Sequence, residues 1–104
     1  MTLTLVQGDA KVPLRGALFN DDTEQPLDIT DCDVFFQLRK KDDNRYTVNA
    51  ECDILDEDGG IVRYVTGVND LNTPGDYLAQ FEVRYPDGTI QTTKDWVEIT
   101  IRRQ

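Results

Sequence analysis

The sequence predicts an all-β protein, an antiparallel β-sandwich of seven or eight short strands. Apolar residues alternate with polar ones over several segments, as they do on strands with one buried face. Turn-forming residues recur at intervals of about 8 to 12 positions, and no long window has the period of a helix. With 104 residues, 38% of them hydrophobic, the chain is expected to form one domain over residues 1–104.

The stretch 72–89 is the most clearly specified strand. Every second position from Tyr77 is apolar or aromatic, with Leu78, Gln80 and Glu82 between, so the odd-numbered side chains are expected to face a core: Tyr77, Ala79, Phe81, Val83 and Tyr85.

Turn residues flank this strand on both sides. Pro86, Asp87 and Gly88 match a type I turn closed by a left-handed glycine, which predicts an antiparallel return strand. Gly75 makes a corner two residues before Tyr77, similar to the tyrosine corner of immunoglobulin-like sandwiches, in which the phenol bonds to upstream backbone. The predicted sandwich is therefore of the immunoglobulin-like kind.

The first half of the chain contains two strands and a long connection. Leu3 and Leu5 share one face of a strand over 2–7. In the next strand, 11–19, Gly16 indicates a bulge or a close approach of another group. The acidic segment 20–33 is expected to be a solvated connection, held to the core by Leu27 and Ile29.

The remaining strands follow from the same alternation. Apolar positions predict a strand over 34–39, a returning partner over 46–54 with Tyr46 facing inward, and a β-branched strand over 61–66. The last strand occupies 89–93 and 95–102. Ile90 lies on an even position whereas the later apolar residues are odd, which predicts a break near Thr93-Lys94.

Charge excludes some partners. Twenty acidic residues, eleven basic ones and no histidine give a net charge of -9, which repels a phosphate backbone, so nucleic acid is not an expected partner. No apolar run approaches the roughly 20 residues of a membrane span. The N-terminal residues do not resemble a secretory signal, and synthesis in the cytoplasm is expected.

Two sets of residues raise the question of a covalent or metal link. Cys32 and Cys52 lie on even-numbered positions, as do their inward-facing neighbours Val34 and Ile54, so both thiols are expected to face the core. Either a disulfide or two buried free thiols is consistent with the sequence. They make no closed zinc site without histidine. The acids 56–58 before Gly59 suggest a calcium loop, but the EF-hand spacing would require Ile54 as a ligand; a solvated turn is the alternative.

Catalysis has little support in the sequence. Histidine, the usual base for a serine or cysteine nucleophile, is missing, and no phosphate-binding or nucleophile-elbow motif is present. We therefore expect no catalytic residues, no cofactor and no small-molecule substrate.

Outward apolar side chains are the better lead. If Phe36 and Val97 face inward, then Phe35 and Trp96 point outward, as does Leu78. Phe35, Leu78 and Trp96 are therefore the candidate interface residues, and exposed strand edges are a second mode of contact. The alternative is that such a side chain covers a sheet end or lies under a loop.

Three pieces of the chain together resemble a known family, the immunoglobulin-like N-terminal domain of the phage baseplate upper protein. They are Gly8-Asp9 with Val12-Pro13-Leu14-Arg15-Gly16, Pro26-Leu27-Asp28-Ile29-Thr30-Asp31 leading to Val34-Phe35-Phe36-Gln37-Leu38-Arg39, and Gly60-Ile61-Val62-Arg63-Tyr64 followed by 72–83 and Pro86-Asp87-Gly88. Asp31 stands where that family usually has glycine.

The resemblance implies a structural component of a tailed-phage virion, in the baseplate, tail or capsid surface. Such a component binds other virion proteins and brings no catalytic residues. Self-association is also expected, because virion assemblies are built on closed symmetry. The alternative function is a host-recognition or carbohydrate-binding module of the same fold, in which Trp96, flanked by carboxylates, stacks on a sugar.

Overall fold

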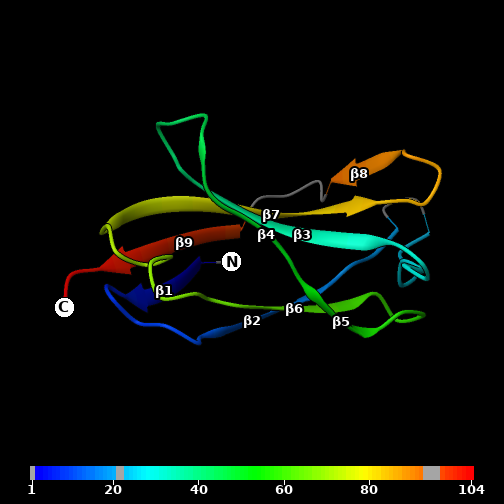
Figure 1. The fold of residues 1–104 in the computed structure, drawn as a ribbon, viewed down its shortest axis with the longest axis horizontal. Coiled ribbons are helices and arrows are strands. Elements are labelled where there is room, and N and C mark those ends of the chain that lie inside the picture. The colour runs from blue at the N-terminus through cyan, green and yellow to red at the C-terminus, as the bar shows by residue number, and fades with distance from the viewer. Residues whose placement is uncertain (1, 21–22, 93–96) are drawn as a thin grey trace.

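The computed structural model describes residues 2–20, 23–92 and 97–104 and contains two β-sheets packed face to face (Figure 1). The described residues form nine strands and no helix: β1 Thr2–Val6, β2 Pro13–Ala17, β3 Asp33–Lys40, β4 Tyr46–Glu51, β5 Asp53–Asp56, β6 Ile61–Val65, β7 Gly75–Arg84, β8 Ile90–Thr92 and β9 Val97–Arg102. Accordingly, this part of the chain has no helix long and apolar enough to cross a membrane.

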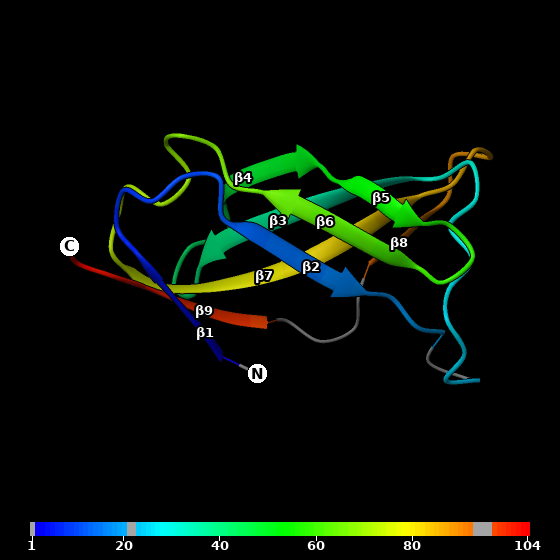
Figure 2. The ribbon, with the colours of Figure 1, turned by 90° about the horizontal axis from the view of Figure 1, so that it is seen from below.

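The strand order is that of an immunoglobulin-like sandwich. The larger sheet runs β1-β9-β7-β3-β4, with β8 paired to the end of β7, and the smaller sheet runs β2-β6-β5. Figure 2 shows the smaller sheet lying across the larger one. The smaller sheet corresponds to strands B-E-D, and the larger one to strands C-F-G extended by β4 beside C and by β1 beside G. The predicted all-β sandwich is confirmed, and one pairing, β1 with β9, is parallel.

Aromatic rings form the centre of the core. The Phe36 ring stacks on Tyr64 of the opposite sheet with centroids 4.7 Å apart, and Phe81 packs against Phe36 at 5.7 Å. Around them the inward residues of both sheets are fully buried, among them Val34, Leu38, Val62, Val83 and Ile101. Burying these side chains is the main favourable term for the fold.

The predicted strand 46–54 is divided, because the chain changes sheets at Cys52. β4 pairs with β3 in the larger sheet, whereas β5 pairs with β6 in the smaller one. The Cys52 amide donates to the Val34 carbonyl at 2.7 Å, which is the last bond to the larger sheet before the crossing.

Tyr46 faces solvent, and the prediction that it points inward is wrong. The β3–β4 register shifts between Leu38 and Arg39, so Val48 lies opposite Leu38 while Tyr46 lies opposite Arg39. This irregularity leaves Thr47 with no residue opposite it in the β3–β4 register, although its hydroxyl donates to the Leu38 carbonyl at 3.3 Å, and it moves Tyr46, 42% exposed, to the outer face.

The connection between β2 and β3 is held at one fully buried residue. Ile29 is 0% exposed, and its amide donates to the Glu57 carbonyl at 3.0 Å. Leu27 is partly buried against the same core. Asp31 stands where the family that the chain resembles usually has glycine. Its φ of 61° is in the left-handed region, which glycine adopts readily.

Both cysteines are buried free thiols. Cys32 precedes β3, and its Sγ contacts the Thr30 carbonyl at 3.5 Å. Burial, reinforced by the neighbouring charges of Asp53 and Glu51, raises the pKa of Cys52 to about 12. A raised thiol pKa lowers reactivity because the thiolate is the nucleophile.

The start of β7 carries a tyrosine corner. Gly75 has φ 148°, a conformation that side chains rarely adopt, and the chain then enters the strand. The buried Tyr77 donates its hydroxyl to the Thr73 carbonyl at 2.7 Å. The corner thus joins the β6–β7 connection to the first residues of the strand.

Replacing Tyr77 with phenylalanine is expected to lower the free energy of unfolding by about 1 kcal/mol, because the partly buried hydrogen bond to Thr73 is lost while the ring packing is retained. Urea unfolding of the two proteins measures the difference. Tyr85→Phe is the matched control, since its hydroxyl bonds to the exposed Gln91 side chain at 2.8 Å. Equal losses in the two variants would contradict a structural role for the corner.

The β7–β8 turn follows Arg84 at the other end. Gly88 donates its amide to the Tyr85 carbonyl at 3.0 Å and has φ 90°, and the Tyr85 amide donates to the Thr89 carbonyl at 2.9 Å. Pro86 and Asp87 occupy the central positions. Hydrogen bonds from the Thr89 hydroxyl and amide hold the pKa of Asp87 below its ordinary value. This is a type I turn closed by a left-handed glycine.

The return strand is present as β8 and β9. Val97, Ile99 and Ile101 of β9 face the core, and Ile90 of β8 is exposed. The break predicted near Thr93-Lys94 and the candidate residue Trp96 lie outside the described residues.

Candidate interface on the outer face of the larger sheet

Gln37 lies at the centre of the outer face of the larger sheet. It points away from the core, yet it is only 2% exposed, because neighbouring polar side chains cover it. The register places it between Asn49 of β4 and Gln80 of β7. Because Gln37 is covered by its neighbours, the polar side chains of this face form one continuous layer rather than separate surface groups.

The Gln37 amide is hydrogen-bonded at both of its ends. Its Nε2 donates to Glu82 Oε2 at 2.9 Å and to Asn49 Oδ1 at 3.5 Å, while its Oε1 accepts from Gln80 Nε2 at 2.7 Å. Gln80 Nε2 also donates to Tyr46 Oη at 3.3 Å. These bonds connect β4, β3 and β7 and fix the rotamers of the side chains involved.

Phe35 and Arg84 continue the network toward the β8 end of the sheet. The Arg84 guanidinium carbon lies 3.8 Å from the centroid of the Phe35 ring, and Arg84 Nε donates to Glu82 Oε1 at 2.7 Å. Phe35 is half-buried under this arginine. The ring is therefore held in place by a cation–π contact and presents only part of its surface.

Leu78 lies toward the opposite end of the same face. It is half-buried and lies between Arg39 of β3 and Glu98 of β9. Glu98 forms an ion pair with Lys41 at 3.0 Å, and Arg39 donates to backbone carbonyls of the β3–β4 turn. Leu78 is thus an apolar side chain framed by charged groups.

Phe35 and Leu78 share a face but do not touch. Phe35 is opposite Glu82 on β7, four residues from Leu78, which at about 3.3 Å per residue places them roughly 13 Å apart. The Gln37–Gln80 pair lies between them. The candidate residues therefore form two apolar points on a polar surface, and the third candidate, Trp96, is outside the described part of the chain.

The sequence did not identify the hydrogen-bonded layer. Alternation along β3 and β7 does put Gln37, Gln80 and Glu82 outward, but their mutual bonds depend on the register between the two strands. Tyr46 joins the layer only because of the irregularity in β4. A run of amide side chains at outward positions of two neighbouring strands was the available signal.

The acidic turn before Gly59 is organised by its own backbone. Asp56 Oδ1 accepts the Gly59 amide at 3.1 Å. Within residues 2–20, 23–92 and 97–104 there is no group of three or more acidic, cysteine or histidine side chains placed to hold a metal ion.

The chain matches a known family over most of its length. The model of the BppU N-terminal domain, the N-terminal domain of the baseplate upper protein, matches residues 17–100. No curated protein matches the chain. The matched region includes every strand of the sandwich except β1, most of β2 and the end of β9. Because this match covers well over half of the 104 residues, the chain belongs to the BppU N-terminal domain family, a family of phage baseplate structural proteins.

Proposed function

We propose that this domain is a non-enzymatic structural part of the baseplate that binds other virion proteins through the outer face of its larger sheet. The hydrogen-bonded layer around Gln37 carries this proposal. Its side chains are already ordered in the free domain, so binding to this face costs little conformational entropy. The domain acts in the virion after synthesis in the host cytoplasm.

The two apolar points supply the contacts that a polar surface lacks. Interfaces gain most of their affinity from a few apolar or aromatic anchors surrounded by polar groups. Phe35 and Leu78 are such anchors, and Arg84 and Glu98 beside them provide charges that fix the orientation of the partner. From its place in the sequence Trp96 remains a further candidate.

Self-association belongs to the same proposal. Virion assemblies are built with closed symmetry, in which one surface is used repeatedly. A net charge of -9 opposes association of free copies, so copies come together only when a partner with basic groups brings them into a ring.

Leu78→Glu is expected to lower the amount of the domain in purified phage particles at least roughly tenfold, since one buried charge at an interface costs over 1.4 kcal/mol. Quantitative mass spectrometry of the particles measures the copy number. Val68→Glu is the matched control, because Val68 is 75% exposed in the connection after β6.

Thermal unfolding first establishes that both variants remain folded. If folded Leu78→Glu enters particles at the wild-type copy number, the outer face is not the interface. If the wild-type domain is absent from the particles, the proposed baseplate role is wrong altogether.

A further inference from the structure

The smaller sheet ends in an open strand edge. Within the described part of the chain, β2 pairs only with β6 and forms one border of the sheet. At its two ends the Leu18 amide donates to the Gly60 carbonyl at 2.8 Å, and the Thr66 amide donates to the Val12 carbonyl at 3.0 Å. Bonding alternates along an antiparallel pair, so the even-numbered residues of β2 bond to β6.

The odd-numbered residues of β2 consequently direct their backbone groups away from the sheet. Arg15 and Ala17 each present an amide and a carbonyl at this edge, and both residues are exposed. Pro13, which lacks an amide hydrogen, also lies at an odd position, where a proline removes no bond to β6. An incoming strand finds four backbone groups here, together with the Pro13 carbonyl.

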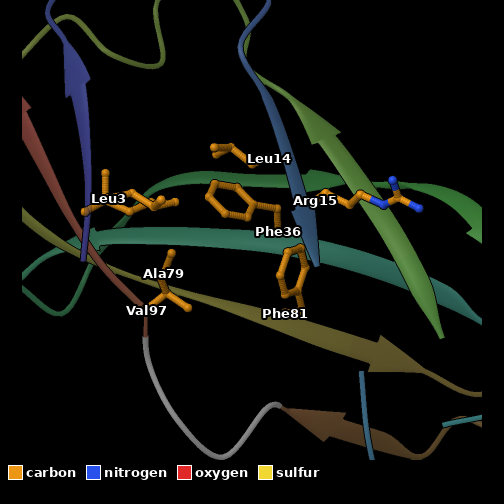
Figure 3. A pocket seen from close by; sticks show the side chains of 8 residues that line it. Leu3, Leu14, Arg15, Phe36, Ala79, Phe81 and Val97 are labelled. Carbon is orange, nitrogen blue, oxygen red and sulfur yellow. The ribbon is translucent and has the colours of Figure 1, made fainter. Parts of the chain in front are cut away.

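An apolar cavity opens beside this edge, between the two sheets. Its volume is about 90 Å³, and Figure 3 shows its walls, which include Leu3 of β1, Leu14 of β2, Phe81 of β7 and Val97 of β9. Leu3 and Leu14 belong to border strands of the two sheets, so the cavity lies at the side of the sandwich where those borders approach each other. It has room for one branched aliphatic side chain.

At Gly16 the Phe81 ring, which forms part of the cavity wall, packs directly against the backbone of β2. A Cβ atom at this position would lie 2.6 Å from Cε2 of the Phe81 ring, so the ring packs against bare backbone. The close approach predicted for Gly16 is thereby confirmed. A strand added along β2 would have its inward side chains over Phe81 and the cavity, in line with Leu14.

Arg15 gives this edge a charge. Arg15 is one of the residues that line the cavity, but its guanidinium group points away from the other lining side chains in Figure 3, and the residue lies opposite Arg63 of β6. Arg63 is bonded to Asp53 at 3.3 Å, whereas the described residues offer Arg15 neither an ion pair nor a hydrogen bond. On an added strand, an acidic residue is therefore favoured at the position beside Arg15.

We infer that the free edge of β2 accepts an extended segment of another virion protein as an added strand. One apolar side chain of that segment fills the cavity, and the acidic side chain next to it in sequence pairs with Arg15. The inference rests on the proposed function. It adds a second contact, at the β2 edge of the smaller sheet, to the contact proposed for the outer face of the larger sheet.

A second copy of this chain is a poorer occupant of the edge. Its own β2 would bring Arg15 rather than an acidic residue, and its Leu14 lines its own cavity. Two chains that each carry a charge of -9 also repel each other.

The test uses a synthetic peptide, acetyl-Thr-Val-Thr-Leu-Glu-Val-Thr-amide, titrated into the whole domain and followed by NMR. Slower hydrogen exchange at the Arg15 and Ala17 amides and shifted methyl signals of Leu14 and Val97 are expected. The same peptide with Lys in place of Glu is expected to bind roughly fivefold more weakly, and Arg15→Glu is expected to reverse that preference. Ala17→Pro removes an edge amide that makes no bond to β6, and is expected to abolish binding without unfolding the domain.

The inference is overturned if millimolar peptide leaves the Arg15 and Ala17 amides unchanged, if the Glu and Lys peptides bind equally, or if Ala17→Pro binds normally. These results are separate from those for the proposed function. If Arg15→Glu is incorporated into particles normally while Leu78→Glu is not, the inference of strand addition is wrong and the proposed baseplate role still stands.

Discussion

Gly60→Ala is expected to lower the free energy of unfolding by about 3 kcal/mol or more, the sum of backbone strain and steric overlap. Gly60 has φ 66°, a left-handed conformation that costs an alanine about 1 to 2 kcal/mol. A Cβ atom there would also lie 2.7 Å from the carbonyl oxygens of both Leu18 and Leu27. Both contacts are with backbone, which cannot move aside as a side chain can.

The local hydrogen bonds explain why this overlap cannot relax. The Gly60 carbonyl accepts the Leu18 amide at 2.8 Å, and the Leu18 carbonyl accepts the Leu27 amide at 2.9 Å. Gly60 thus lies where the end of β2, the following connection and the start of β6 meet. Displacing any one of the three would break bonds in the other two.

Gly8→Ala is the matched control for this prediction. Gly8 has φ 84°, but nothing lies within 4 Å of the position of its Cβ atom, so only the backbone strain applies. Urea unfolding is expected to show a loss of about 1 kcal/mol for Gly8→Ala and of about 3 kcal/mol or more for Gly60→Ala. Thermal unfolding is expected to show a melting temperature lower by more than about 10 °C for Gly60→Ala. Equal losses at the two glycines would mean that the close packing around Gly60 is wrong.

The alternation of side chains accounts for what could be predicted of the fold. In β7, Tyr77, Ala79 and Val83 are buried as their parity requires, and the fully buried Ile29 holds the acidic connection to the core. Such local patterns determine which face of a strand is apolar. They do not determine which strand lies beside it.

The sheet change at Cys52 shows this limit. Val48 and Ala50 before the crossing and Ile54 after it have the same parity, because the inner faces of both sheets look into one core. A strand that continues and a strand that crosses to the other sheet therefore have the same pattern. The crossing depends on pairing with β6, a contact between distant parts of the sequence.

The candidate interface was predictable to the same extent. The outward positions of Phe35 and Leu78 follow from parity, but the roughly 13 Å between them follows from the β3–β7 register. The burial of Gln37 depends on three neighbours from two other strands. A one-residue slip of β3 would turn Gln37 to the other face of the sheet, away from these neighbours, and the sequence of β3 alone does not determine the register.

Raising the pH from 8 to 11 is expected to destabilise the domain by at least about 2 kcal/mol, because buried acidic groups in the native state keep protons that the unfolded chain loses. Burial raises the pKa of Cys52 from 9.0 to about 12. Burial followed by the charge of Asp28 raises the pKa of Cys32, and burial followed by the hydrogen bond to Asp70 raises the pKa of Tyr64.

The direction follows from the proton balance. Below about pH 9 both states of Cys52 are protonated and its contribution to stability is fully present. Between about pH 9 and 12 the unfolded chain has lost the thiol proton while the native protein retains it, so unfolding becomes more favourable as the pH rises. Each such group contributes a slope of about 1.4 kcal/mol per pH unit.

Cys52→Ala separates this effect from the general repulsion that grows as any acidic protein is made more negative. The variant is less stable than the wild type at pH 8, since a buried side chain is shortened, but its thiol contribution to the pH dependence is absent. Urea unfolding at pH 8, 9, 10 and 11 is therefore expected to show the stability difference between the two proteins narrowing as the pH rises. Parallel curves would show that the Cys52 thiol ionises as readily in the native protein as in the unfolded chain, contrary to its burial at the point where the chain changes sheets.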